Sequence, residues 1–383
     1  MKIAFISNFN ARDIHKRSGT PFHMARALER QGIEIHYIGS LKNHVPFGFK
    51  LKNAWKKLVG SKRESSRNNT YAMQHYAKQV QQQLSHLKVD AILAHISNPI
   101  SYLETDSPMI LWTDGLYAGM LGFVSHFSKD AATTVAQANL GTALALHRCK
   151  LALFSSQWAA DSAIELYGIS KEKVKVVPFG ANIEKRNSLT DIQNFLKLRS
   201  PKIIKLLFIG KEWERKGGDV AFDVAKALHA DGHAVELNFV GCYPPTTANQ
   251  EDIPSYIKCH GFVSKRTPEG LEKISTLCAE SHFLFVPSRA EPYGIVFCEA
   301  NAFGLPCLTS YVGGIGTIVK DNVNGMTFAL NSPTQVYCDY ILNLMKNYTL
   351  YEALALSSFH EFETRLNWDV ATQEVKKLIQ EMD

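Results

Sequence analysis

The sequence contains no long apolar run and few cysteines. No stretch approaches the run of about 18 apolar residues that a transmembrane helix requires, so no membrane span is predicted. Residues 1–7 are too short for the apolar core of a secretory signal and end at polar Asn8, which predicts a first strand. The seven cysteines are odd in number and include no C-x-x-C pair. They are interpreted as reduced core residues of a cytosolic protein.

The composition and length are those of a two-domain globular protein. The chain has 383 residues, of which 45% are hydrophobic and 20% are charged. Apolar runs of strand length alternate with helical patterns, which favours parallel sheets in layered α/β domains. Polar, weakly periodic residues 180–202 are the best linker candidate. The predicted strands span 2–7, 33–39, 90–95, 109–113, 151–155 and 174–178 in the first half, and 203–209, 234–240, 282–286 and 306–309 in the second half.

Residues 291–299, with the sequence E-P-Y-G-I-V-F-C-E, are the most informative segment. Glu291 and Glu299 lie eight positions apart across a turn that opens a helix, so both carboxylates can face one ligand. Gly294 lets the backbone approach that ligand closely. The N-terminus of the helix supplies N–H donors and a partial positive charge, which suit a phosphate. Since the run 282–286 predicts a buried strand, we expect the ligand at its carboxyl end.

A basic loop framed by glycines follows the strand predicted at 203–209. Its sequence, G-K-E-W-E-R-K-G-G at residues 210–218, contains Lys211 and Lys216 and precedes a helical pattern. A solvated basic loop is the interpretation that needs no ligand.

These motifs continue through E-A-N-A-F-G-L-P, V-G-G-I and D-N-V-N-G, and the stretch from Ser288 to Gly325 resembles the donor-binding core of the family 4 glycosyltransferases. Members of that family are retaining, nucleotide-sugar-dependent enzymes of the GT-B fold. The resemblance implies an α/β protein with two Rossmann-like domains whose parallel sheets face each other across a cleft. It implies an acceptor-binding domain at 1–185, a nucleotide-sugar-binding domain at 200–365, and a C-terminal helix at 366–383 that crosses back to the first domain.

The resemblance also implies roles for individual residues. Glu299 takes the ribose hydroxyls of the donor, and Glu291 orients the hydroxyls of its sugar. Lys211 and Lys216 hold the diphosphate, although Lys211 stands where the family has arginine, so the charge is kept and the bidentate fork is lost. Backbone groups near Gly241 and from Gly261 to Val263 are expected to recognise the base. Besides these four residues, the donor-binding positions implied are Gly19, Gly210, Gly241, Phe262, Val263, Tyr293, Gly294, Ile295 and Val296.

Asp114 follows the strand predicted at 109–113, where many family members carry a histidine that touches the donor sugar. Aspartate keeps an acceptor for a sugar hydroxyl but provides no proton donor at neutral pH. An Asp-Gly turn is the alternative interpretation. The residues to which a catalytic role is assigned are therefore Glu291, Asp114, Lys216 and Lys211.

The implied activity is that of a hexosyltransferase-type glycosyltransferase (EC 2.4). It moves a sugar from a UDP- or GDP-linked donor to a glycan or lipid-linked acceptor in cell-surface polysaccharide or glycolipid synthesis. No D-x-D motif lies in a plausible site, so we expect no metal and no cofactor other than the donor substrate. Two alternatives remain: a non-catalytic GT-B accessory or carbohydrate-binding subunit, and another GT-B enzyme such as a sugar-nucleotide epimerase or a phosphorylase.

Acidic residues are nearly absent from residues 42–67, where Glu64 faces eight basic side chains interleaved with apolar ones such as Trp55. Such a segment suits an anionic membrane surface, where each basic residue contributes about 1 kcal/mol, or an acidic acceptor. A solvated helix and loop is an equally good interpretation. No nucleic acid is expected, because no binding motif accompanies the charge. The expected location is cytoplasmic, peripheral at the inner face of the membrane if the segment binds lipid. The basic residues are Lys42, Lys50, Lys52, Lys56, Lys57, Lys62, Arg63 and Arg67.

Overall fold

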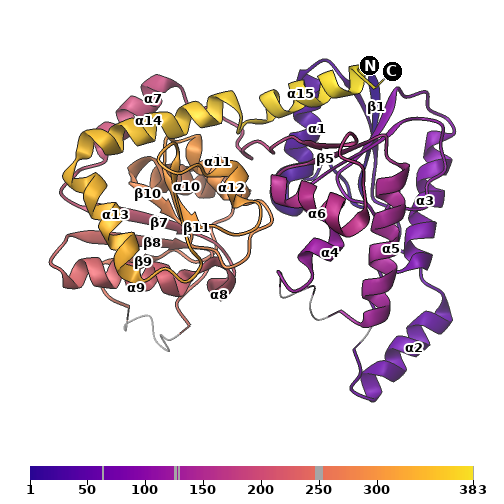
Figure 1. The fold of residues 1–383 in the computed structure, drawn as a ribbon, viewed down its shortest axis with the longest axis horizontal. Helices are drawn as coiled ribbons and strands as arrows, with labels where there is room; N and C mark the ends of the chain where they lie inside the picture. The colour runs from indigo at the N-terminus through magenta and orange to yellow at the C-terminus, as the bar shows by residue number, and fades with distance from the viewer. Residues whose placement is uncertain (63, 125–126, 128–129, 246–252, 383) are drawn as a thin grey trace. The chain divides into compact units, whose positions relative to one another are not determined.

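The computed structural model describes residues 1–62, 64–124, 127, 130–245 and 253–382. Arg63, which belongs to the basic segment at residues 42–67, lies outside the described residues. The chain forms two compact units (Figure 1). Unit 1 combines Met1–Pro178 with Trp368–Asp383, and unit 2 is Phe179–Asn367.

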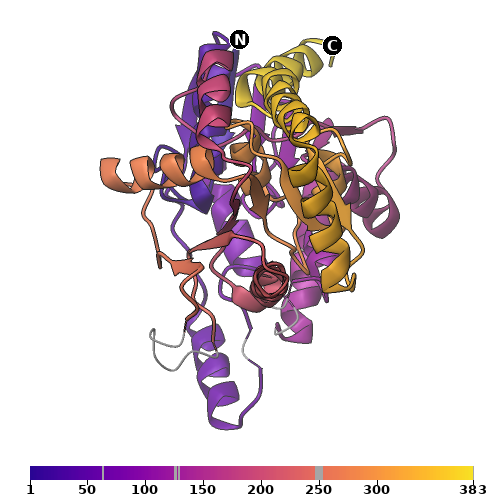
Figure 2. The same ribbon diagram turned by 90° about the vertical axis from the view of Figure 1, so that its left-hand side faces the viewer.

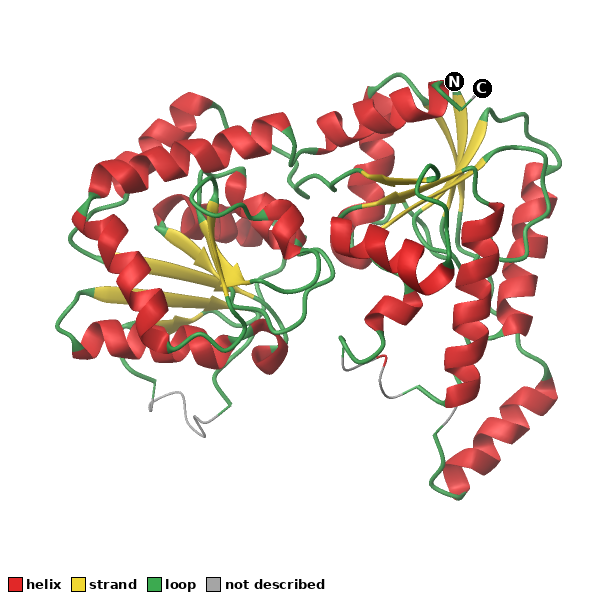
Figure 3. Ribbon diagram, in the orientation of Figure 1, coloured by secondary structure: helices red, strands yellow, loops and turns green. Residues whose placement is uncertain are grey.

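Unit 1 is built on a parallel sheet of six strands in the order β2-β1-β3-β4-β5-β6, with helices on its faces (Figure 3). Strands β3, β4 and β5 are buried along their whole length, as is typical of parallel strands covered on both faces. The strands are β1 (Lys2–Ile6), β2 (Glu34–Ile38), β3 (Ala91–Ala94), β4 (Met109–Thr113), β5 (Leu151–Phe154) and β6 (Val174–Val176). The helices are η1 (Arg17–Gly19), α1 (Thr20–Arg30), α2 (Phe47–Leu58), α3 (Thr70–Leu84), α4 (Tyr117–Met120), α5 (Ala132–Arg148), α6 (Gln157–Tyr167) and α15 (Trp368–Gln380).

Unit 2 has a second parallel six-stranded sheet, in the order β12-β11-β10-β7-β8-β9. Its strands are β7 (Ile204–Ile209), β8 (Val235–Val240), β9 (Ile257–Cys259), β10 (Phe283–Phe285), β11 (Cys307–Ser310) and β12 (Gly325–Phe328). Its helices are α7 (Leu189–Leu198), α8 (Trp213–Lys216), α9 (Gly218–Ala230), α10 (Pro268–Glu280), α11 (Ile295–Asn301), α12 (Ile315–Ile318), α13 (Thr334–Lys346) and α14 (Tyr348–Thr364).

Each of the ten predicted strands is confirmed to within two residues at either end. The predicted linker at 180–202 is wrong, because α7 occupies its centre. Ser188 and Asp191 form a capping box at the start of that helix, in which each side chain accepts a hydrogen bond from the other residue's backbone N–H. Strands β9 and β12 have three and four residues and were not predicted.

The C-terminal helix α15 packs beside α1 within unit 1 (Figure 1). The Arg30 guanidinium lies 2.6 Å from a carboxylate oxygen of Asp369, and Lys376 donates to the backbone oxygen of Gln31. The Trp368 ring meets the Trp112 ring edge-on, with centroids 5.6 Å apart. The last helix of the chain therefore completes the core of the first unit.

A single buried guanidinium organises the core of unit 2. Arg199 is 2% exposed and donates to four backbone oxygens and to the Tyr351 hydroxyl. Two of these oxygens, on Cys278 and Ala279, belong to the last turn of α10, and the others follow the end of α11. The carbonyl groups at helix ends have no partner within the helix, so Arg199 satisfies groups that would otherwise be buried unpaired.

Among the described residues, no helix combines the length and the apolarity needed to cross a membrane.

Candidate active site

The order of the strands in unit 2 brings the two predicted motifs together. β7 lies between β10 and β8, so the chain winds outward in opposite directions from the β10–β7 pair. Ligands of such sheets bind where the winding reverses, outside the carboxyl ends of the strands. The glycine-framed basic loop follows β7, and the segment containing Glu291 follows β10. The switch point of the sheet is therefore the candidate site.

Lys216 and Glu291 meet at this switch point. The Lys216 ammonium donates to Glu291 Oε2, and both residues are more than 90% buried. Arg215 lies near the same carboxylate oxygen: its Nη1 atom is 3.6 Å from Glu291 Oε2 and donates to the Ala290 backbone oxygen. Two cations, Lys216 and Arg215, thus lie beside the Glu291 carboxylate, and Arg215 is also held by the Ala290 backbone oxygen.

Glycines allow the two loops to come this close. Gly217 has φ +73°, and a Cβ atom there would lie 2.1 Å from the backbone oxygen of Pro287 in the opposite loop. Gly294 has φ +95° and precedes α11, and a Cβ atom there would meet the Phe297 ring at 2.6 Å. A side chain at either position would push the loops apart or force a strained backbone.

Glu299 lies in α11, and its side chain is 11% exposed. Its Oε2 atom accepts a hydrogen bond from the Lys265 ammonium at 2.6 Å. Lys265 lies between β9 and α10 and was not singled out from the sequence. Its only sequence signal is its position shortly after Gly261, Phe262 and Val263, which were predicted to lie near the base.

The loops after β7, β8 and β9 meet through glycines. The N–H of Gly210 donates to Val240, and the N–H of Gly241 donates to the Gly261 oxygen at 2.7 Å. A Cβ atom on Gly241 would lie 2.6 Å from the Gly210 oxygen. On this platform the Lys211 ammonium rests over the exposed Phe262 ring, 4.4 Å from its centroid. Lys211 therefore contacts an aromatic face, where cation–π attraction holds it.

Tyr293 is the predicted donor-binding residue whose side chain the structure places elsewhere. Its hydroxyl donates to the Phe179 backbone oxygen at 2.6 Å, and the residue is 3% exposed. Burial raises the pKa of Tyr293 well above its usual value. A donor contact from Tyr293 is thus confined to its backbone, and the side chain anchors the start of unit 2.

The predicted residues of the first half lie at the carboxyl edge of the sheet of unit 1. Gly19 has φ +84° and caps α1, while Asp114 directly follows β4. At the same edge His95 follows β3, and its Nε2 atom lies 3.1 Å from Ser7 Oγ. Burial lowers the pKa of His95 to about 3, so its imidazole is neutral at physiological pH.

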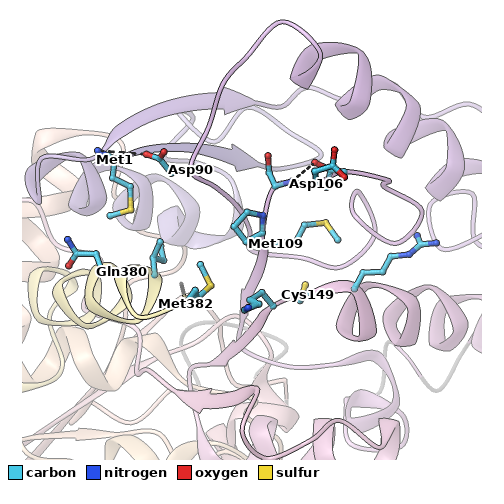
Figure 4. Close-up of a pocket in the computed structure, with 13 residues that line it drawn as sticks. Met1, Asp90, Asp106, Met109, Cys149, Gln380 and Met382 are labelled. Atoms are coloured by element: carbon cyan, nitrogen blue, oxygen red, sulfur yellow. Dashed lines mark hydrogen bonds and ion pairs between the residues drawn. The ribbon is translucent and has the colours of Figure 1, made fainter.

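A pocket of about 880 Å³ opens at the opposite, amino edge of the same sheet (Figure 4). It lies between the starts of β1, β3, β4 and β5 and the end of α15. Because ligands of doubly wound sheets bind at the carboxyl edge, this pocket is not the candidate active site. The labelled residues that line it are Met1, Asp90, Asp106, Met109, Cys149, Gln380 and Met382.

The middle of the basic segment, residues 42–67, forms helix α2 (Phe47–Leu58). This helix projects from the rest of unit 1 in both views (Figures 1 and 2). None of its residues is buried. Phe47, Leu51, Trp55 and Leu58 are spaced by three or four positions on one helical face, and all are between 56% and 85% exposed. An amphipathic helix whose apolar face is uncovered is a candidate surface for binding.

Glu64, in the loop after α2, is bound to side chains of this helix. Its carboxylate accepts from Lys52 and Lys56 at 2.8 Å each. Its backbone oxygen accepts from the Asn53 side-chain amide, and its backbone N–H donates to the oxygen of the same amide. The two lysines lower the pKa of Glu64 to about 2. Two of the basic residues of the segment are therefore occupied by an internal carboxylate.

Comparison with known proteins relates both halves of the chain to glycosyltransferases. Residues 21–185 match the family model described as Glycosyltransferase Family 4, and residues 204–347 match the one described as Glycosyl transferases group 1. One similar protein is the D-inositol 3-phosphate glycosyltransferase of Xylanimonas cellulosilytica, 27% identical over 45% of this chain and 43% of its own length. Another is an amylovoran biosynthesis glycosyltransferase of Erwinia amylovora, 24% identical over 56% of this chain and 52% of its own. The chain thus spans about half the length of these curated relatives.

A solved structure matches along the whole chain. Sucrose-phosphate synthase from Thermosynechococcus elongatus superposes with a TM-score of 0.69 at 14% identity, covering 100% of this chain and 99% of its own. At this identity the match concerns the fold. Together with the two six-stranded parallel sheets, it confirms the predicted GT-B fold with two Rossmann-like domains.

Proposed function

Because this chain belongs to the family 4 glycosyltransferases, we propose that it is a retaining glycosyltransferase that moves a sugar from a nucleotide-diphosphate sugar to an acceptor. The observation that carries the proposal is the pairing of Lys216 with Glu291 at the switch point of the sheet. This pair combines a cation suited to a leaving diphosphate with a carboxylate suited to sugar hydroxyls.

In the proposed reaction, the bond between the sugar and the diphosphate breaks and negative charge develops on the diphosphate. Lys216, Lys211 and the first backbone N–H groups of α11 (Gly294 to Val296) stabilise that charge. Lys216 is already held at the site by Glu291, whereas Lys211 must leave the Phe262 ring to reach the diphosphate. Donor binding therefore exchanges internal partners of the two lysines for phosphate oxygens.

Glu291 acts as a positioning residue in this scheme. Once Lys216 turns to the diphosphate, the Glu291 carboxylate accepts hydrogen bonds from the sugar hydroxyls, and Arg215 stays beside it as a cationic partner. The acceptor attacks from the face that the diphosphate leaves, and a diphosphate oxygen takes the acceptor's proton. The anomeric configuration is then retained without a covalent enzyme intermediate, unlike the two-carboxylate scheme of glycoside hydrolases.

The remaining donor contacts are also proposals. Glu299 binds the ribose, and the backbone around Gly241 and Phe262 receives the base, which leaves UDP and GDP both open. The lysines neutralise the diphosphate, so the proposed reaction needs neither a metal ion nor a cofactor.

The acceptor is proposed to be a glycan or a lipid-linked glycan, in the synthesis of cell-surface polysaccharide or glycolipid. The amylovoran biosynthesis glycosyltransferase among the relatives supports the polysaccharide class. The exposed apolar face of α2, with its lysines, supports a peripheral contact with an anionic membrane through residues 42–67. A cytoplasmic enzyme at the inner face of the membrane is consistent with both features.

Hydrolysis and transfer from a panel of UDP- and GDP-sugars, with and without acceptors, tests the proposal. A glycosyltransferase releases free nucleoside diphosphate slowly from one donor and faster when its acceptor is added. Binding of a glycan without turnover of any donor would instead identify an accessory subunit. Conversion of the sugar while it stays attached to its nucleotide would identify an epimerase. Melting temperatures measured with the same panel identify the donor before the activity assays, because a bound ligand raises the melting temperature by mass action.

A further inference from the structure

The ion pair between Lys265 and Glu299 differs from an ordinary surface ion pair because one of its partners is nearly buried. The carboxylate lies in α11 with a side chain only 11% exposed, whereas the Lys265 side chain is 41% exposed. The ammonium therefore lies on the solvent side of a nearly buried carboxylate. Any ligand that approaches Glu299 meets Lys265 as well.

Contacts other than this pair anchor α11. Phe297 and Cys298 on the same helix are fully buried, and the Asn301 side chain is held by the Phe297 oxygen and the Asn324 amide. These contacts anchor the helix through its other faces. A carboxylate at position 299 adds a cost of desolvation, which a partly exposed lysine offsets only in part.

A carboxylate and an ammonium side by side complement a cis-diol. Each hydroxyl of a diol donates one hydrogen bond and accepts others. Glu299 can accept from the two O–H groups of a ribose. The ammonium carries three N–H donors, and while one is directed at Glu299 Oε2, another can donate to a hydroxyl oxygen. Removing one hydroxyl leaves a desolvated carboxylate oxygen without its donor, which costs more than the lost bond alone.

We propose that Lys265 binds the ribose of the donor together with Glu299, and that this pair makes the protein select ribonucleotides over 2′-deoxyribonucleotides. The inference rests on the proposed use of a nucleotide-sugar donor. It adds to that proposal a second ribose-binding residue and a measurable selectivity.

The experiment compares the dissociation constants of UDP and GDP with those of 2′-deoxy-UDP and 2′-deoxy-GDP, measured by calorimetry. The variants are Lys265→Met, Lys265→Arg and Glu299→Gln. Lys258→Met is the matched control, because Lys258 pairs with Glu236 in the same unit. Lys265→Gln is a second, more polar variant, which keeps the test available if Lys265→Met lowers the melting temperature.

The parent protein is expected to bind the ribonucleotide about tenfold or more tightly than its 2′-deoxy counterpart. Lys265→Met and Glu299→Gln should weaken binding of the ribonucleotide by a similar factor. The dissociation constants of the ribonucleotide and its 2′-deoxy counterpart should then lie within a few fold of each other. Lys265→Arg should keep part of the preference, and Lys258→Met all of it. A folded Lys265→Met protein with the parent's selectivity would overturn the inference, and so would a parent that binds the ribonucleotide and its 2′-deoxy counterpart equally well. A parent that binds none of the four nucleotides would contradict the proposed function itself.

Discussion

The ammonium group of Lys216 is bonded to a carboxylate oxygen of Glu291, a residue 75 positions away in the sequence. Each is the partner of the other while no donor is bound, and each is assigned to a different part of the donor. The pair keeps both side chains oriented at the switch point and keeps a nearly buried charge neutralised. Binding of a diphosphate has to compete with this internal bond.

The first prediction concerns Lys216→Ala. Turnover should fall by on the order of 10²-fold or more, because a charge-assisted contact to the leaving diphosphate is lost. The stability loss should stay below the 3–5 kcal/mol or so that is typical when a buried pair is broken, because Arg215 still faces Glu291. Steady-state kinetics and urea unfolding measure both quantities, with Lys258→Ala as the control. Near-parent turnover in a folded variant would remove Lys216 from the mechanism.

The second prediction concerns metal ions. Transfer activity should survive an excess of EDTA, because lysines and backbone N–H groups carry the charge stabilisation in the proposed reaction. The measurement is the initial rate before and after chelation, followed by addition of Mg²⁺ or Mn²⁺. Loss of activity that either ion restores would show that the lysines alone do not stabilise the leaving group.

The third prediction concerns the apolar face of α2. Leu51→Ser combined with Trp55→Ser should weaken sedimentation with vesicles containing anionic lipid, while nucleotide affinity stays unchanged. Lys50→Ser combined with Lys57→Ser should weaken sedimentation with these vesicles mainly at low salt. At physiological ionic strength the Debye length is only about 8 Å, so salt already screens much of the attraction between the lysines and the lipid. Lys52 and Lys56 are left intact because they hold Glu64.

Leu198→Ser, which changes a similarly exposed leucine of unit 2, is the control for the lipid experiment. If both α2 variants sediment with anionic vesicles like the parent, the helix is a solvated surface and the membrane proposal is wrong.

The fourth prediction concerns Arg199→Met. Four backbone oxygens, three of them in buried bonds, lose the guanidinium as donor, and an unsatisfied buried group costs about 1–3 kcal/mol. We expect a loss on the order of 3–5 kcal/mol, seen as a lower urea midpoint. The exposed pair of Arg289 with Asp219 provides the comparison, since Arg289→Met should cost at most about 1 kcal/mol. Equal effects of the two substitutions would contradict the role given to Arg199.

The fifth prediction concerns the dependence of stability on pH. Burial lowers the pKa of His282 to about 3, and Arg199 and Lys205 nearby act in the same direction. The unfolded state binds a proton at this histidine below about pH 6.5, whereas the folded state does not until about pH 3. Stability should therefore fall as the pH drops from 6.5, with His282 adding a slope of up to about 1.4 kcal/mol per pH unit.

His282→Asn should flatten this slope, because an amide oxygen can still accept from the Lys205 N–H without titrating. Urea midpoints between pH 4.5 and 7.5 measure the difference. His95 contributes in the same sense in unit 1, so the parent slope should not vanish altogether in the variant. An identical slope in parent and variant would mean that His282 titrates normally in the folded protein.

The strands could be predicted because they depend on local sequence, whereas the roles of the candidate residues rest on the family resemblance and stay predictions. Apolar runs of four to seven residues identify buried strands, and glycines in the loops mark close approaches of the backbone. The helix α7 was missed because its exposed face is polar, although Ser188 and Asp191 at capping-box spacing were a readable signal. Strands β9 and β12 are too short to show a pattern.

Contacts between distant segments could not be predicted in the same way. The bond of Lys216 to Glu291 depends on β7 pairing with β10, which the order of strands along the chain does not reveal. Lys265 was missed because only tertiary structure brings the loop after β9 to α11. The place of Tyr293 in the turn predicts a donor contact but does not reveal that its hydroxyl donates to the Phe179 backbone oxygen.

The packing of α15 against α1 has a consequence for the order in which the protein folds during synthesis. Unit 1 is interrupted by the whole of unit 2, so the ribosome makes Phe179–Asn367 before the helix that covers α1 emerges. At about 5–20 residues per second, this leaves α1 and the Trp112 ring uncovered for roughly 10–40 s. During that interval the nascent first unit exposes the apolar surface that α15 later covers, the kind of surface to which chaperones bind and at which nascent chains aggregate.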